Sequence, residues 1–290
     1  MSLGASIANA ALAAAAYGMS ATQTRSGADA ALIAPGDGTT AAIVPVATLG
    51  FTPGAGTRVR DVAVVRAMLS RKMVRAEFDE RVKLDPAIVA ELASLTRSIH
   101  AGLTLHVLTD APTLLALGKF QELADSTVIN RTTFACELAE WLLANDSDAF
   151  VGMRGREFGL DDASTRRFRD GLAGVGPLLP DETAAFAKAG NIGMRSSSAV
   201  LVVTTARDDL EHRLVAGYAF EAMALRLTLA GMSVAMRAGI TEVDAPNMAL
   251  RGRLRTLHRP TVVFRTGKPL RAPDGVREHS ARPRLADVAF

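Results

Sequence analysis

Two stretches of the chain are rich in cations: "SRKMVRAEF" at residues 70–78 and "REHSARPRLADV" at residues 277–288. The first places Arg71, Lys72 and Arg75 within five positions. Guanidinium groups bind phosphate through paired hydrogen bonds, and a lysine adds a compact positive charge. One such cluster alone is typical of a solvated helix end, whereas two clusters that converge in the fold would form a phosphate site.

Other kinds of catalytic site have no support in the sequence. The five histidines lack metal-ligand spacing, with no HExxH pattern, so we expect no metal site. A GxSxG nucleophile elbow and a GxxxxGK[ST] phosphate loop are both absent. The stretch "GMRGREFG" at residues 152–159 is rich in glycine, but no strand precedes it as a dinucleotide fingerprint requires. Anion recognition by arginine is therefore the chemistry that remains.

The single cysteine, Cys136, excludes an internal disulfide and a cysteine-based metal site. It falls on the apolar face of a helical pattern, so we expect it to be a small buried hydrophobe rather than a nucleophile. One free cysteine fits a protein of the reducing cytoplasm, which is the location we predict.

Composition argues against a nucleic-acid partner and a membrane span. The net charge is only +3, aromatic residues make up 5% of the chain, and the cations are scattered rather than clustered with aromatics. The apolar N-terminus, "MSLGASIANAALAAAAYGM", lacks the basic start of a signal peptide and is too short and too alanine-rich to span a bilayer. We predict a closely packed helix there, with a secretory signal as the alternative.

The elements that must position these residues follow from apolar periodicity and capping residues. Asp85 and Pro86 begin one helix as N-cap and first residue, and Asp208 and Asp209 begin the longest, which ends at Gly231. We expect helices near residues 4–18, 61–70, 86–100, 111–144 (broken near 125–133), 162–172, 180–190, 208–231 and 245–258. Strands are expected near residues 40–49, 103–110, 199–205 and 259–267. This mixture predicts an α+β or α/β fold from about residue 60 onward.

The glycine-containing stretch "GFTPGAGT" at residues 50–57 is the best candidate for a linker. We place the boundary there, with residues 1–56 as one part and residues 57–290 as a domain. The first part, with one helix and a strand or two, is too small to bury a core alone.

The order of motifs along residues 60–290 resembles the nitroreductase family, and most closely its Acg-type branch. "RKMVRAEF" is similar to the family's "RRTNRRPF"-like motif, and "HSARPRLADV" is similar to its closing "SPRRPLADV". Between them, "VLVVTTARDDLEHRLVAGYAFEAMALRLTLAGMSV" resembles the family's strand and long dimer-core helix, and "RPTVVFRTGKP" resembles its last core strand. The resemblance implies an α+β nitroreductase-like fold with a central mixed or antiparallel sheet.

The resemblance also implies FMN as cofactor. The positions matching the family's phosphate site are Arg71, Lys72, Met73, Arg75 and Arg282, and those near the flavin ring are Met236, Arg237 and Ala238. At Met73 the family has Ser or Thr, whose hydroxyl donates to the phosphate, so one ligand is lost here. The family's Ser-x-x-Asn-x-Gln-Pro-Trp-like segment, which contacts the ring, precedes the helix at which this sequence starts. Residues 1–56 are thus expected to be a shortened N-terminal half.

On this resemblance the expected function is an NAD(P)H-dependent oxidoreductase that reduces nitro or quinone-like acceptors. No catalytic side chain is assigned, because FMN carries the chemistry in such enzymes. Two alternatives stay open: a non-catalytic flavin-binding or storage protein, and a scaffold that has lost flavin. The family resemblance further implies either a homodimer or two halves within one chain that imitate a dimer.

Overall fold

The computed structural model describes residues 1–25, 47–54, 59–149 and 151–270. Arg282, the basic cluster at residues 277–288 and most of the strand expected at residues 40–49 lie outside the described residues.

A four-stranded antiparallel sheet forms the centre of the molecule. Its strands, in spatial order, are β3 (Leu103–Leu108), β6 (Ala199–Thr205), β8 (Arg259–Gly267) and β7 (Ser233–Met236). Three of these match the predicted strands. The fourth, β7, lies in the sequence "SVAM" and is not among the predicted strands; it is a short edge strand paired to β8. Helices surround this sheet, which confirms the α+β prediction.

The helices also follow the sequence pattern closely. They are α1 (Ser2–Ala16), α2 (Val59–Ser70), α3 (Pro86–Ile99), α4 (Ala111–Ile129), α5 (Thr132–Trp141), α6 (Asp162–Leu172), α7 (Pro180–Arg195), α8 (Leu210–Leu229), α9 (Gly239–Glu242) and α10 (Asp244–Leu254). The predicted break between residues 125 and 133 is present, between α4 and α5. A 3₁₀ turn, η2 (Gly155–Phe158), and two short strands, β4 (Leu142–Leu143) and β5 (Met153–Arg154), complete the described elements.

Side-chain caps set the helix starts where the sequence predicted them. The Asp85 carboxylate accepts from the Ala87 amide at 2.8 Å at the start of α3. At α8 the Asp209 carboxylate accepts from the His212 amide at 2.9 Å. Each cap provides an acceptor for an amide that has no partner inside its helix.

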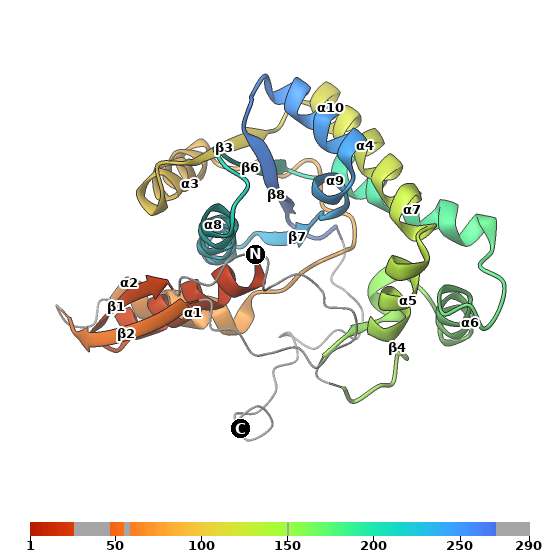
Figure 1. Ribbon diagram of the computed structural model, residues 1–290, viewed down its shortest axis with the longest axis horizontal. Coiled ribbons are helices and arrows are strands. Elements are labelled where there is room, and N and C mark those ends of the chain that lie inside the picture. Colours follow the sequence, from red (N-terminus) through yellow and green to blue (C-terminus); the bar gives the residue numbers. More distant parts are fainter. Residues whose placement is uncertain (26–46, 55–58, 150, 271–290) are drawn as a thin grey trace.

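The sheet separates two apolar layers (Figure 1). Leu201 and Val203 of β6 face α8 and α3, whereas Val200 and Val202 face α4, α7, α9 and α10. All residues of β6 are buried. A strand covered on both faces needs a continuous apolar run rather than alternation, and "AVLVVTT" supplies it.

The N-terminal elements pack on the central helix α8. Strands β1 (Met19–Arg25) and β2 (Ala47–Pro53) form an antiparallel hairpin, so Gly50 and Pro53 of the predicted linker belong to a strand instead. Helix α1 lies so close to α8 that a Cβ on Gly4 would run into the Leu214 carbonyl. The predicted closely packed helix is thus confirmed.

Cys136 is exposed, and the expectation that it is buried is wrong. The face of α5 that packs inward carries Ala135 and Ala139, with Phe134 and Leu138 beside them. Cys136 follows Ala135 by about 100° around the helix, which takes its side chain off that face. Among the helices that the structure describes, none is both long and apolar enough to cross a membrane.

Candidate functional site

The segment at residues 70–78 leaves α2 and runs extended along the edge of the sheet. Met73 pairs with Val234 of β7 in a parallel bridge, and the Val74 amide donates to the Val234 carbonyl at 2.9 Å. Met73 packs against the core, and Phe78 is buried at the end of the segment. The segment is therefore fixed to the sheet at both ends and is not a solvated helix terminus.

Arg71 turns toward the central helix. Its Nε lies 3.1 Å from Oε1 of Glu221, a residue of α8 whose side chain is 2% exposed. The Arg71 side chain is itself only 16% exposed. This buried ion pair joins the start of the segment to α8, and Lys72 beside it is half-buried.

Arg75 points in another direction, toward the glycine-rich stretch that we had discounted. Its Nη1 donates to Oε2 of Glu157 at 3.0 Å, its Nη2 lies 2.8 Å from the Met153 sulfur, and its guanidinium stacks over the Phe158 ring at 4.9 Å. Burial lowers the pKa of Arg75, and the Glu157 charge opposes that shift. The Arg75 side chain remains 31% exposed, so solvent and ligands have access to it.

The loop at residues 236–238 follows β7 and brings Arg237 to the same region. The Arg237 amide donates to the Val263 carbonyl at 2.8 Å, which continues the pairing with β8. Ala238 accepts from the Thr241 amide and hydroxyl at 2.8 and 2.7 Å and so begins α9. Burial lowers the pKa of Arg237, and the positive charge of Arg75 lowers it further. Met236, the last residue of β7, packs against the core.

A third guanidinium, that of Arg265 on β8, was not predicted. Arg265 is fully buried, and its Nη2 donates to the carbonyl oxygens of Val74, Arg75 and Ala76 at 3.1, 2.8 and 2.7 Å. The guanidinium also stacks over the Phe78 ring at 4.2 Å. Burial, followed by the charge of Arg237, lowers the pKa of Arg265 to about 8, which leaves the group protonated at pH 7.

One buried carboxyl faces this arginine cluster, defined here as Arg75, Arg237 and Arg265. Asp125 of α4 accepts from the Gln121 amide at 2.7 Å. Burial raises the pKa of Asp125 to about 7, although the charge of Arg237 acts against the rise. Asp125 is thus only partly ionised near neutral pH and compensates Arg237 incompletely.

The arginine cluster holds buried donors that have no acceptor. They are Nε of Arg237 and both Nε and Nη1 of Arg265. Within the described ranges, no carboxylate lies within 4.0 Å of either guanidinium. An anion at this position would satisfy donors that are otherwise expensive to bury.

The structure thus brings together two of the predicted sets, residues 71–75 and residues 236–238. The remaining phosphate candidate, Arg282, is outside the described residues. Sequence reasoning missed Arg265, Asp125 and Glu157. A signal for Arg265 was available, because an arginine inside the otherwise buried strand "TVVFRTG" must find partners in the core.

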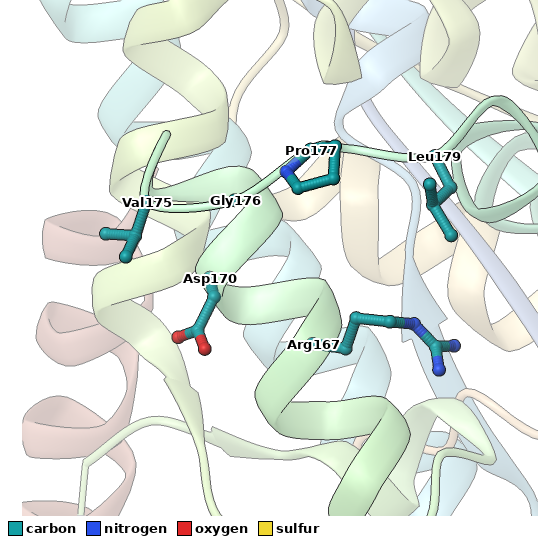
Figure 2. A pocket seen from close by; sticks show the side chains of 6 residues that line it. All are labelled: Arg167, Asp170, Val175, Gly176, Pro177 and Leu179. Atoms are coloured by element: carbon teal, nitrogen blue, oxygen red, sulfur yellow. The ribbon is translucent and has the colours of Figure 1, made fainter.

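A surface hollow of about 490 Å³ lies apart from the arginine cluster, between α6 and the start of α7 (Figure 2). Arg167 and Asp170 of α6 line it with Val175, Pro177 and Leu179. Nε of Arg167 donates to Glu182 at 2.8 Å. In the described part of the chain, no three His, Cys, Asp or Glu side chains gather as a metal site would need.

No family model and no curated protein matches the chain. Several solved structures resemble it in shape. One is an FMN- and NADPH-dependent nitroreductase of Sphigopyxis sp. strain HMH, with 17% identity, a TM-score of 0.48, and coverage of 78% of this chain and 97% of the other. Another is an FMN-dependent nitroreductase of Mycobacterium smegmatis in complex with NADPH, with 14% identity, a TM-score of 0.48, and coverage of 79% and 97%. A third is a nitroreductase with bound FMN from Desulfitobacterium hafniense DCB-2, with 9% identity, a TM-score of 0.47, and coverage of 79% and 97%.

Proposed function

We propose that the chain binds FMN and acts as an NAD(P)H-dependent oxidoreductase of nitroreductase type, reducing nitro or quinone-like acceptors. One observation carries the proposal. The segment that resembles the family's phosphate motif and the loop that resembles its ring-side segment lie against each other, joined through Met73, Val74 and Val234. These segments are about 160 residues apart in the sequence, and only the fold makes them neighbours.

The residues present fit a phosphate group. Arg75 is accessible, Arg237 has a buried Nε without an acceptor, and Asp125, the carboxyl whose charge acts on Arg237, has a raised pKa. The net charge of this region is therefore positive, as an anion site requires. In the proposal Arg71, Lys72, Arg75 and Arg282 act on the phosphate, and Met236, Arg237 and Ala238 lie beside the ring.

When bound, FMN would accept hydride from the nicotinamide and pass it to the acceptor. The protein's share is to hold and orient the cofactor. Arg75 is restrained for this by Glu157 and Phe158, and the Ala238 carbonyl is held by α9.

Two contacts favour the second candidate, a non-catalytic flavin-binding protein. Arg71 is paired with Glu221, and Met73 packs in the core where a hydroxyl would donate in the family pattern. Fewer donors would then reach the phosphate than in an enzyme with the full motif. Measurement of NAD(P)H oxidation with a nitroaromatic or a quinone separates the two candidates.

The test of cofactor binding is a titration of flavin-free protein with FMN and with riboflavin, which lacks the phosphate. Arg75→Ala should weaken FMN binding while leaving the weaker binding of riboflavin unchanged, whereas Arg237→Ala, beside the ring, should weaken the binding of both. Arg213→Ala is a matched control, because that arginine lies on α8 and pairs with Asp208 instead. If wild-type protein binds FMN no better than riboflavin, the proposed phosphate site is refuted. If it binds neither, the proposal that the chain binds a flavin is refuted.

A homodimer in the reducing cytoplasm is part of the same proposal. Large apolar side chains are exposed on and near the N-terminal elements, among them Leu3, Tyr17, Phe51 and Leu69. A second copy could cover them, since apolar patches of this kind mark protein contacts. Analytical ultracentrifugation over a range of protein concentrations tests this, and a strictly monomeric protein would refute it.

A further inference from the structure

Arg265 carries more hydrogen-bonding capacity than the protein around it satisfies. Its Nη2 serves the three carbonyls of residues 74–76, but its Nε and Nη1 are buried without an acceptor. Arg265 is 0% exposed, so solvent does not reach it. A guanidinium has five donors and no acceptor, and each donor left unpaired away from water is costly.

The Arg237 guanidinium, whose buried Nε also lacks an acceptor, lies close by. Both guanidiniums lie against Gly193, near the end of α7. A Cβ built on Gly193 would lie 3.3 Å from Nε of Arg265 and nearer still to Nη2 of Arg237. Because both nitrogens lie close to that one point, they are less than about 6 Å apart. Two donors that share a single acceptor atom at ordinary hydrogen-bond distances, about 2.7–3.2 Å from each, can be up to about 6 Å apart, so the two guanidinium groups can share one.

The charges around the pair leave a positive excess. Glu157 is engaged with Arg75 at 3.0 Å, and Glu77, whose charge acts on Arg265, is exposed. Asp125 acts on Arg237 from outside ion-pair distance and is itself destabilised as an anion by burial. Two buried guanidiniums at this separation repel each other unless an anion lies between them.

We propose that Arg237 and Arg265 bind a small anion through one acceptor atom held between their guanidinium groups. The ligand class is a halide or a single oxygen of a phosphate-type oxyanion. Because Nη2 of Arg265 donates to the carbonyls of residues 74–76, an anion that holds Arg265 in place also stabilises the conformation of the segment that carries Arg75. The inference does not depend on flavin, since the donors are present whether or not FMN binds.

The test uses flavin-free full-length protein and three anion sources. Sodium bromide, sodium phosphate and FMN are each titrated while the unfolding temperature is measured, with riboflavin as the analogue without phosphate. A saturable rise in unfolding temperature with bromide or phosphate is expected for wild-type protein. The rise should be lost in Arg237→Gln and in Gly193→Ala, whose Cβ would displace the Arg237 guanidinium.

Arg226→Gln is the control for general effects of salt, because Arg226 is a surface residue paired with Glu91. It should keep the saturable rise. A crystal grown with bromide should show an anomalous peak within hydrogen-bond distance of Arg237 and Arg265. This measurement also covers the case in which a variant fails to fold.

The outcomes separate the sources of the anion. Competition between FMN and bromide identifies the anion as the flavin phosphate, and simultaneous binding identifies a separate inorganic ion; both support the proposal. Bromide binding without any FMN binding also supports the anion site and refutes only the proposal that the chain binds FMN. An equal rise in wild-type, Arg237→Gln and Arg226→Gln protein would overturn the anion site, and so would crystals grown with bromide and with phosphate that show neither ion at the two arginines.

Discussion

Arg265 donates from Nη2 to the main-chain carbonyl of Arg75 at 2.8 Å, across 190 positions of sequence. The same nitrogen reaches the carbonyls of Val74 and Ala76. One side chain thereby holds three consecutive peptide groups of the basic segment. The conformation that presents Arg75 is set by a residue of the last core strand.

Replacing Arg265 should therefore cost much more stability than replacing a surface arginine. Arg265→Met leaves three carbonyls without this donor, that of Val74 in a buried bond, and we expect a loss of about 1–3 kcal/mol in the free energy of unfolding. Arg265→Lys keeps a charge and some of the donors and should lose less. Urea denaturation measures both.

The matched control is Arg81→Met. The Arg81 side chain is 82% exposed and pairs only with nearby Asp79, so its loss should change stability by less than about 1 kcal/mol. A similar small loss for Arg265→Met would contradict the structural role given to Arg265.

The elements of this fold could be predicted because their signals are local. Asp85 and Asp209 cap the helices that follow them directly in the sequence. The continuous apolar run of "AVLVVTT" predicts a strand that is buried on both faces. The edge strand β7 was missed, because a four-residue strand has too few positions to show a period. Cys136 was misplaced by about 100° on α5, an error that apolar periodicity allows when Phe134, Ala135 and Cys136 are adjacent.

The site could be predicted only in part, because its geometry is a property of the tertiary structure. The likeness of residues 71–75 to a known motif gave the region, but the direction of each side chain depends on distant partners. Arg71 turns to Glu221 of α8, and Arg75 turns to Glu157. No spacing rule relates such pairs, since they lie 150 and 82 positions apart.

The Arg71–Glu221 pair allows a test of whether Arg71 is structural or binds phosphate. Arg71→Met leaves a carboxylate that is 2% exposed without its cation, and we expect a loss of about 3–5 kcal/mol. In the double variant Arg71→Met/Glu221→Leu much of this loss should be recovered, because no buried charge remains. A double-mutant cycle by urea denaturation measures the coupling.

The double variant also reports on the cofactor. If Arg71 contacts the phosphate, that variant loses the preference for FMN over riboflavin; if Arg71 only supports the segment, the preference remains. Additive effects of the two single substitutions would show that the ion pair contributes no coupling.

The contact between α1 and α8 depends on the absence of side chains. A Cβ on Gly217 would run into the Met1 carbonyl of α1, so Gly217→Ala should destabilise the protein by about 1–3 kcal/mol through forced separation of the helices. Gly252→Ala is the control. It lies within α10 with nothing within 4 Å of the added Cβ, and alanine's higher helix propensity should stabilise it by up to about 1 kcal/mol. Thermal unfolding compares the two variants. A change in unfolding temperature of the same sign for both would contradict the close packing of α1.

Asp125 should make stability fall as pH rises through the range below neutrality. Its pKa is raised by burial from 3.8 to about 7, so the folded protein binds a proton that the unfolded chain has already released. The free energy of unfolding contributed by this group therefore decreases between about pH 4 and pH 7 and is constant above. At about 1.4 kcal/mol per pKa unit the total is up to about 4 kcal/mol.

Asp125→Asn should remove that slope and raise stability at pH 8, because the amide stays neutral and can still accept from Gln121. The groups facing it, Arg237 and the backbone of Gly190 and Gly239, are otherwise unchanged. Asp110→Asn is the control. Hydrogen bonding to Thr113 lowers the pKa of Asp110, so any pH dependence of stability from this group lies below pH 4. Asparagine also caps α4 as well as aspartate does. The measurement is urea denaturation between pH 4 and pH 8. If Asp125→Asn kept the wild-type slope of unfolding free energy against pH, the raised pKa of Asp125 would be contradicted.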